Sequence, residues 1–186
     1  MKLPIGSVHG RFQPLHFEHL EYLAAALQRV RFLHVGITQF DTASLLHVDG
    51  AGEHRADPRS NPFTYFERAE LASLALCGLG TSPERFRVGP FPIERPNDLA
   101  DFLPLTVPVL TTRVDEWNDS KIAILTSIGY HVEVLYEREP KGVSGAQIRE
   151  LMATGNPEWE SLVPESTVAF LRSLNLSERL NSTSEA

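Results

Sequence analysis

Short apolar runs alternate with longer segments of helical periodicity along most of the chain. In the segment 16–29, for example, Leu20, Leu23 and Leu27 follow the i, i+3, i+7 spacing of one helix face. Apolar runs predict strands over residues 3–8, 32–37, 86–88, 107–111 and 131–136. Helical periods predict helices over residues 16–29, 64–77, 117–128, 144–153 and 167–174.

Strands that alternate with helices are typical of βαβ units. The sequence therefore predicts an α/β fold, a Rossmann-like three-layer α/β/α arrangement with a mostly parallel sheet. In such a sheet, ligands bind beyond the carboxyl ends of the strands, at helix N-termini. The loop after strand 3–8 is one such place, and the loop that leads to Ser144, the expected N-cap of helix 144–153, is another. We expect these two helix starts to meet in one cleft.

The length of 186 residues fits one domain, which we place at residues 1–176. The polar segment 177–186 is expected to be a disordered tail. Periodicity is absent from residues 39–61, which indicates a long loop, and its His47 and His54 are expected to be bystanders.

The formal net charge is −7, which argues against a general polyanion-binding surface and so against a nucleic-acid partner. No apolar stretch is long enough for a membrane span, so no membrane partner is expected. The single cysteine, Cys77, excludes a disulfide within the chain and favours a cytoplasmic setting. Its apolar neighbours predict a buried bystander rather than a nucleophile. Whether the chain forms a homo-oligomer stays open.

The junction between the first strand and the first helix carries Arg11, His16 and His19. Backbone N–H groups and the helix dipole favour a phosphate group there, and arginine and histidine add donors and positive charge. By spacing alone, the His-x-x-His pair fits a solvated face, a core histidine or half of a metal site, and a structural role is favoured over a functional one. No third ligand with suitable spacing follows, so no metal site built from the protein alone is predicted.

Three motifs in order resemble one family. Residues 10–19 resemble the G-R-F-Q-P-x-H-x-G-H motif of the nucleotidylyltransferase superfamily, and within it the archaeal-type nicotinamide-nucleotide adenylyltransferases. Residues 61–68 are similar to the N-P-F-T-x-x-E-R of those enzymes, and residues 144–149 to their S-G-T-x-I-R. The resemblance runs from about residue 5 to residue 171, which is nearly the whole chain.

The resemblance assigns roles to individual residues. It implies that the catalytic residues are His16, His19 and Arg149. It implies nucleotide binding by Gly10, Arg11, Phe12, Gln13, Ser144, Gly145 and Ile148. It also indicates acceptor binding by Asn97, Arg113 and Trp117.

The implied reaction joins the phosphate or phosphonate of a small acceptor to the α-phosphorus of a nucleoside triphosphate, ATP or CTP, and expels pyrophosphate. The attacking oxygen is already anionic, so catalysis rests on positioning and on charge stabilisation. Magnesium is expected as a cofactor that is bound mainly through the nucleotide phosphates. Arg11 is a candidate for the acceptor's phosphate.

The chain departs from the family pattern at several positions. Glu18 replaces the glycine of the histidine motif, and it must turn away, bind the metal or meet a cationic acceptor. Ala146 replaces a threonine. Asn97 matches an asparagine of the adenylyltransferases, but the tryptophan that closely follows it there and helps to hold nicotinamide is missing. The leading hypothesis is an adenylyltransferase that acts on nicotinamide mononucleotide (NMN). The alternatives are a CTP-dependent cytidylyltransferase for a small phosphate or phosphonate, and a nucleotide-binding regulator that has lost catalysis.

Several other side chains have two interpretations. Arg68 and Glu67 fit a surface ion pair as well as a role in the site. Lys141 fits a solvated loop lysine better than a phosphate ligand. Two aromatic residues, Phe12 and Phe63, are expected in the core. Trp117 follows a strand end, where either a base or an acceptor would lie.

Overall fold

The computed structural model describes residues 1–43, 45, 56–114, 116–138 and 142–182. His47, His54 and Lys141 lie outside this part of the chain. The strands of the sheet are β1 (Leu3–Gly10), β2 (Val30–Ile37), β3 (Phe86–Pro90), β4 (Val109–Arg113) and β5 (Val132–Glu137). They run parallel in the order β3-β2-β1-β4-β5.

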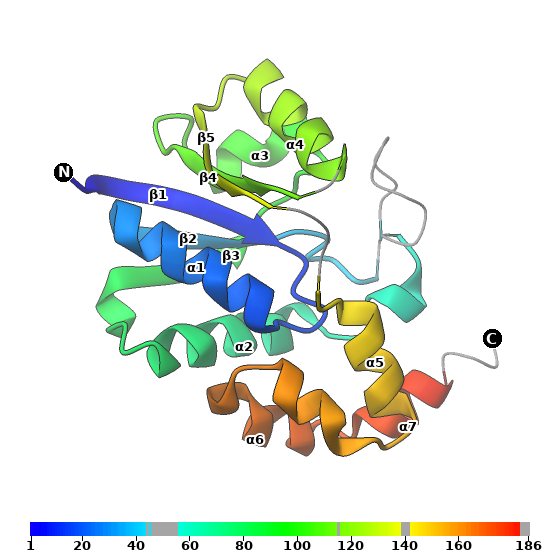
Figure 1. Cartoon of the computed structure of the whole chain (residues 1–186). Coiled ribbons are helices and arrows are strands. Elements are labelled where there is room, and N and C mark those ends of the chain that lie inside the picture. Colours follow the sequence, from blue (N-terminus) through cyan, green and yellow to red (C-terminus); the bar gives the residue numbers. More distant parts are fainter. Residues whose placement is uncertain (44, 46–55, 115, 139–141, 183–186) are drawn as a thin grey trace.

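Helices cover both faces of this sheet (Figure 1). Their bounds are α1 (Phe17–Arg29), α2 (Tyr65–Gly78), α3 (Leu99–Phe102), α4 (Glu116–Ser127), α5 (Gly145–Ala153), α6 (Glu165–Ser173) and α7 (Leu176–Ser182). In Figure 1, α1 and α2 lie on one side of the sheet and α3 and α4 on the other. The predicted three-layer α/β/α fold is confirmed.

The strand order reverses between β1 and β4, which is where ligands bind in open α/β sheets. β1 pairs with β2 along most of its length, but its register with β4 is limited to Ser7 opposite Val109. A further link is the hydroxyl of Tyr22, which donates to the carbonyl of Leu110 at 2.5 Å. The sheet is therefore weakly joined at the crevice where a ligand is expected.

The buried apolar side chains form two separate clusters. One packs α1, α2 and the later helices against β1 and β2, and it includes Phe12 and Phe63, as predicted. The other contains Phe91, Leu99, Val109 and Leu125, from the chain directly after β3, from α3, from β4 and from α4. β4 contributes to both clusters, because Leu110 belongs to the first.

Two sequence expectations need correction. Cys77 is exposed, because its neighbours Ala75 and Leu76 take the inner side of the last turn of α2. The expected disordered tail is a helix, α7, as far as residue 182. Leu176 is buried, and Arg179 forms an ion pair with Glu67 at 2.7 Å, so an apolar anchor and a charge pair hold this helix.

The structure also bears on transmembrane segments. Within the described residues, no helix combines the length and the apolar character that crossing a bilayer requires.

Candidate active site

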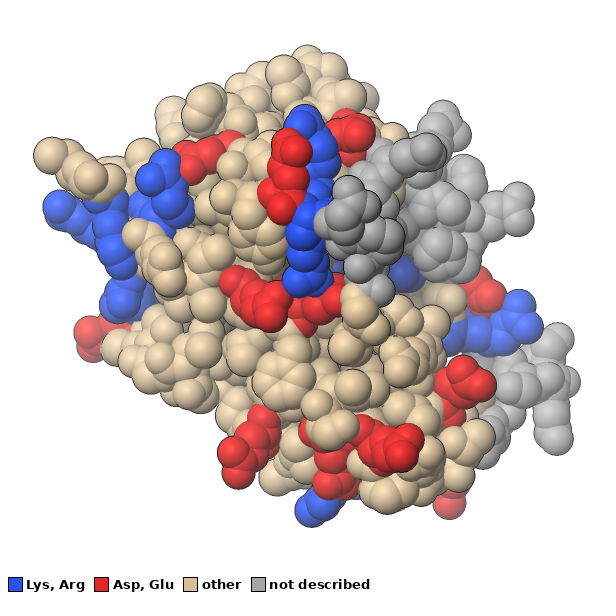
Figure 2. Space-filling model, in the orientation of Figure 1, with Lys and Arg blue, Asp and Glu red and all other residues tan. Residues whose placement is uncertain are grey.

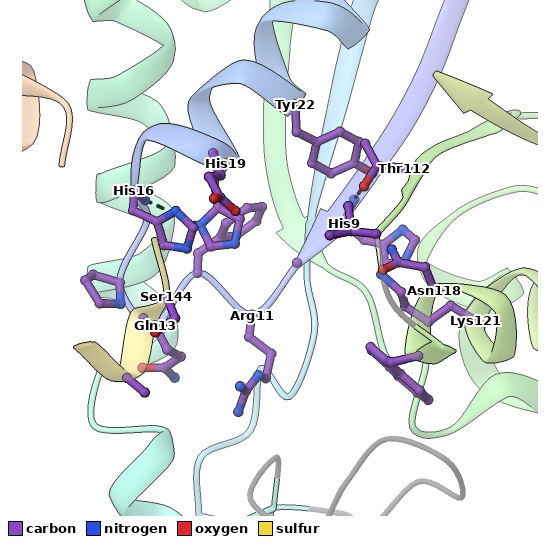
Figure 3. A pocket seen from close by; sticks show the side chains of 18 of the residues that line it. His9, Arg11, Gln13, His16, His19, Tyr22, Thr112, Asn118, Lys121 and Ser144 are labelled. Carbon is purple, nitrogen blue, oxygen red and sulfur yellow. Dashed lines mark hydrogen bonds between the residues drawn. The ribbon is translucent and has the colours of Figure 1, made fainter. Parts of the chain in front are cut away.

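A pocket of about 260 Å³ opens at the carboxyl ends of β1 and β4 (Figure 3). Its walls come from the loop after β1, the start of α1, the end of β4, α4 and the start of α5. The predicted site residues that line it are Gly10, Arg11, Phe12, Gln13, His16, His19, Trp117, Ser144, Gly145 and Arg149. The fold thus brings both helix N-termini to one cleft, as the sequence predicts.

The start of α1 fixes the orientation of its two histidines. The backbone N–H of His16, the N-cap, donates to Nδ1 of His19 at 3.3 Å. Because a backbone N–H can only donate, Nδ1 accepts, and the proton of a neutral His19 ring is on Nε2. The two rings lie 3.8 Å apart, and Phe12 supports His19 edge-on at 5.1 Å. His19 can therefore present a hydrogen-bond donor to a phosphate.

The start of α5 lies on the same side of the pocket as the two histidines (Figure 3). The hydroxyl of Ser144 accepts from the backbone N–H of Gln147, which confirms the predicted N-cap. Gly145 lies so close to the first loop that a Cβ atom there would meet the carbonyl oxygen of Gln13 at 2.6 Å. Arg149 donates to that same carbonyl at 2.7 Å. Burial lowers the pKa of Arg149, but nearby Asp57 opposes the shift, so the guanidinium is charged at neutral pH.

Residues 61–68, the segment that resembles N-P-F-T-x-x-E-R, bind the loop that follows β1. The side chain of Gln13 donates to the carbonyl of Phe63 at 3.2 Å and accepts from its N–H at 2.9 Å. Asn61 accepts from the guanidinium of Arg11 at 3.5 Å. This second motif therefore positions residues of the first motif.

Arg68 is fully buried and does not form the surface pair with Glu67 that the sequence allowed. Its guanidinium donates to the carbonyls of Thr38 and Gln39, both at 2.8 Å, and to that of Arg11 at 3.1 Å. Burial lowers the pKa of Arg68 to about 10. The side chain thus ties the ends of β1 and β2 to α2.

Glu18, the residue in the place of the family's glycine, bridges the two helix starts. Its carboxylate accepts from the backbone N–H groups of Gly142 and Val143, at 2.7 and 3.0 Å, and pairs with Arg138 at 2.5 Å. Burial alone would raise the pKa of Glu18, but these hydrogen bonds and the Arg138 charge outweigh burial and lower it. The sequence left open that Glu18 turns away, binds the metal or meets a cationic acceptor, and the structure shows instead a bond to the loop before α5.

Replacing Glu18 with glutamine should destabilise the protein at neutral pH by about 1 kcal/mol, since a charged acceptor becomes a neutral one. A carboxyl group whose pKa is lower in the folded protein than in the unfolded chain stabilises the fold at pH values above its unfolded pKa. This stabilisation is lost as the pH falls through the pKa of the folded state. The difference in the free energy of unfolding between wild type and Glu18→Gln should therefore shrink on acidification below about pH 4. Urea denaturation of both proteins at a series of pH values measures this difference.

The matched control is Glu21→Gln, because Glu21 is an exposed partner of the same Arg138. This variant should change stability by less than about 0.5 kcal/mol. Equal effects from the two variants, or a Glu18→Gln difference that does not depend on pH, would contradict the bridging role.

Three predicted site residues do not reach the pocket. Ile148 is fully buried in the first apolar cluster and anchors α5 to it. Asn97 is exposed in the turn before α3. Arg113 lies at the surface end of β4, where Asp119 and Glu137 bind its guanidinium at 2.8 and 2.6 Å. Of the three residues expected to bind the acceptor, Trp117 alone lines the pocket, and acceptor roles for Asn97 and Arg113 stay predictions from the resemblance.

The sequence interpretation missed the wall opposite α5, which includes His9, Thr112, Asn118 and Lys121. Signals for these residues existed. His9 is the next-to-last residue of β1 and directly precedes the first motif. Asn118 and Lys121 are three apart on a helix, so they share a face.

Charges around the pocket are local. On the described part of the face drawn in Figure 2, basic side chains stand in small groups with acidic ones beside them. Among the described residues, there is no cluster of three or more side chains with the chemistry to hold a metal ion. Glu18 is the acidic residue of the pocket lining, and the loop and Arg138 already bind it. Magnesium bound through nucleotide phosphates stays a prediction.

Comparison with known proteins shows the family. No family model matches the chain. A phosphonoformate cytidylyltransferase from Streptomyces viridochromogenes is 39% identical over 175 residues, which cover 94% of each chain. The chain belongs to the nucleotidylyltransferases.

Other nucleotidylyltransferases are also similar to it. The nicotinamide-nucleotide adenylyltransferase of Methanosphaerula palustris is 32% identical over 92% of each chain. The Thermococcus kodakarensis enzyme of that name is 29% identical over 92% of this chain and 84% of its own. The crystal structure of a bifunctional NMN adenylyltransferase/ADP ribose pyrophosphatase from Francisella tularensis superposes with a TM-score of 0.65 at 13% identity. It matches 98% of this nucleotidylyltransferase and 53% of the longer chain, and this likeness concerns the fold alone.

Proposed function

We propose that this nucleotidylyltransferase is a CTP-dependent cytidylyltransferase whose acceptor is a small phosphonate or phosphate. The observation that carries the proposal is the 39% identity to a phosphonoformate cytidylyltransferase over 94% of both chains. The departures from the adenylyltransferase pattern add support, because the tryptophan that helps to hold nicotinamide in those enzymes is missing after Asn97, and Asn97 itself lies outside the pocket.

In the proposed reaction, an anionic oxygen of the acceptor attacks the α-phosphorus of CTP. A new P–O bond forms, the bond from the α-phosphorus to the bridging oxygen breaks, and pyrophosphate leaves with that electron pair. No proton transfer is needed at the attacking oxygen. The protein must therefore hold the reactants in line and stabilise charge on the α-phosphate and the leaving group.

Each wall of the pocket has a part in this proposal. Nε2–H of His19 would donate to the α-phosphate, with His16 beside it. The N-terminus of α5 and Arg149 would bind the β- and γ-phosphates, which become the pyrophosphate. Magnesium bound through triphosphate oxygens would neutralise part of their charge.

The second candidate is an adenylyltransferase that uses ATP and NMN. It rests on the 32% identity to a nicotinamide-nucleotide adenylyltransferase and on the resemblance of the three motifs to that family. A regulator without catalysis and a cytoplasmic setting stay predictions from the sequence, and the oligomeric state stays open.

A pyrophosphate-release assay with Mg²⁺ tests the proposal. Each of CTP, ATP, GTP and UTP is combined with phosphonoformate, with methylphosphonate and with NMN. We expect turnover with CTP and a small phosphonate. Turnover confined to ATP with NMN would support the second candidate, and nucleotide binding without turnover in any combination would support the regulator.

A further inference from the structure

The carboxyl end of β1 carries a histidine that the proposed chemistry does not use. His9 is 3% exposed and lines the pocket. Its ring stacks on Phe91, with centroids 4.4 Å apart and planes within 3° of parallel. Neither ring nitrogen has a hydrogen-bond partner among the described residues. A buried polar group without a partner is costly, and a bound ligand would remove that cost.

Two side chains from the start of α4 line the pocket with His9. Asn118 and Lys121 share one helix face, and Figure 3 shows both beside the His9 ring. Burial, and then the charge of Lys121, lowers the pKa of His9, so its ring is neutral. A neutral imidazole offers one donor and one acceptor, Lys121 offers donors, and the Asn118 amide offers both. This wall suits the oxygen atoms of a small polar or anionic group.

The direction of the proposed reaction places the acceptor against this wall. In a nucleotidyl transfer, the attacking and leaving oxygens lie roughly in line on opposite sides of the phosphorus. The leaving pyrophosphate would lie at the α5 wall, near Ser144. Figure 3 shows Ser144, His16 and His19 on one side of the pocket, His9, Asn118 and Lys121 on the other, and Arg11 between them. The attacking acceptor would therefore lie between Arg11 and the His9 wall.

We propose that His9, Asn118 and Lys121 form the acceptor subsite and bind a carboxylate at the end of the acceptor that does not react. The inference rests on the proposed function, which supplies a small phosphonate as the acceptor. Phe91 belongs to the apolar cluster under β4, and it holds the His9 ring as the floor of this subsite. Because Phe91 covers one face of the His9 ring, a longer acceptor would have little room on that side of the subsite.

Steady-state kinetics with two acceptors tests the subsite. Phosphonoformate carries a carboxylate, whereas methylphosphonate presents the same reacting group without one. Wild type should prefer phosphonoformate in kcat/KM, and His9→Phe, which retains a flat ring but no nitrogen, should reduce that preference by on the order of tenfold. Lys121→Gln should reduce the preference similarly. The KM for CTP should change less than about twofold in both variants.

The matched control is His34→Phe, the same substitution at a partly buried histidine of β2 that does not line the pocket. It should leave the preference unchanged. If His9→Phe does not fold, the preference of Lys121→Gln, measured as the ratio of kcat/KM for the two acceptors, tests the subsite instead.

The possible failures are distinguishable. A wild-type enzyme that does not use CTP contradicts the proposed function, and with it the subsite. Turnover with CTP but no preference for phosphonoformate contradicts the subsite alone. A rise in the KM for CTP with an unchanged preference would overturn it too, since His9 would then contact the nucleotide. Equal losses with both acceptors would show a structural role and would also overturn it.

Discussion

His19→Ala should lower kcat by on the order of a hundredfold or more. The backbone N–H of His16 fixes the His19 ring so that the ring proton is on Nε2, and a donor held toward the α-phosphate acts where charge develops in the transition state. The measurement is kcat for pyrophosphate release with the nucleotide and acceptor that wild type uses. KM for the nucleotide should change much less.

The substitution also removes the acceptor that His19 gives to the N-cap, so a second variant separates stability from catalysis. His19→Asn retains a side-chain oxygen for the His16 N–H and should be more stable than His19→Ala, while both are slow. His131→Ala, at an exposed position before β5, is the control and should have the wild-type rate. A folded His19→Ala enzyme with an unchanged kcat would contradict the catalytic assignment.

Arg68→Met should reduce the free energy of unfolding by about 3 kcal/mol or more. The variant retains an apolar stem but leaves the buried carbonyls of Thr38, Gln39 and Arg11 without their donor, and each such loss costs roughly 1–3 kcal/mol. This is a large fraction of the roughly 5–15 kcal/mol that stabilises a typical domain. Urea denaturation gives the value directly.

Arg87→Met is the matched control, because Arg87 is an exposed arginine of β3. It should change the free energy of unfolding by less than about 0.5 kcal/mol. A loss below about 1 kcal/mol for Arg68→Met would show that water or nearby groups replace the guanidinium, and would contradict its role as a tie between β1, β2 and α2.

Local patterns were enough to predict the order of the strands, the helices other than α3 and α7, and the meeting of two helix starts in one cleft. Ser144 shows why: a serine before a helical period is an N-cap wherever the helix lies, and a helix start after a strand reaches the ligand edge of a parallel sheet. The start of α1 follows the same rule. Neither inference depended on contacts between distant segments.

Contacts between distant segments account for what the sequence could not decide. A surface ion pair and a role in the site were equal alternatives for Arg68, and only the carbonyls that converge after β1 and β2 explain its burial. Asn97 was assigned from a family motif, but the turn before α3 holds it outside the pocket. His9 was overlooked because one strand residue gives no sign of the Phe91 ring that stacks on it.

The division of the interior into two clusters has a consequence for engineering. The phosphate side of the pocket is built on the cluster around α1 and β2, whereas Phe91, behind His9, belongs to the cluster under β4. Substitutions in separate packing units usually have additive effects. A library of variants confined to Phe91 and its apolar neighbours can therefore be screened for new acceptors while the triphosphate side keeps its geometry.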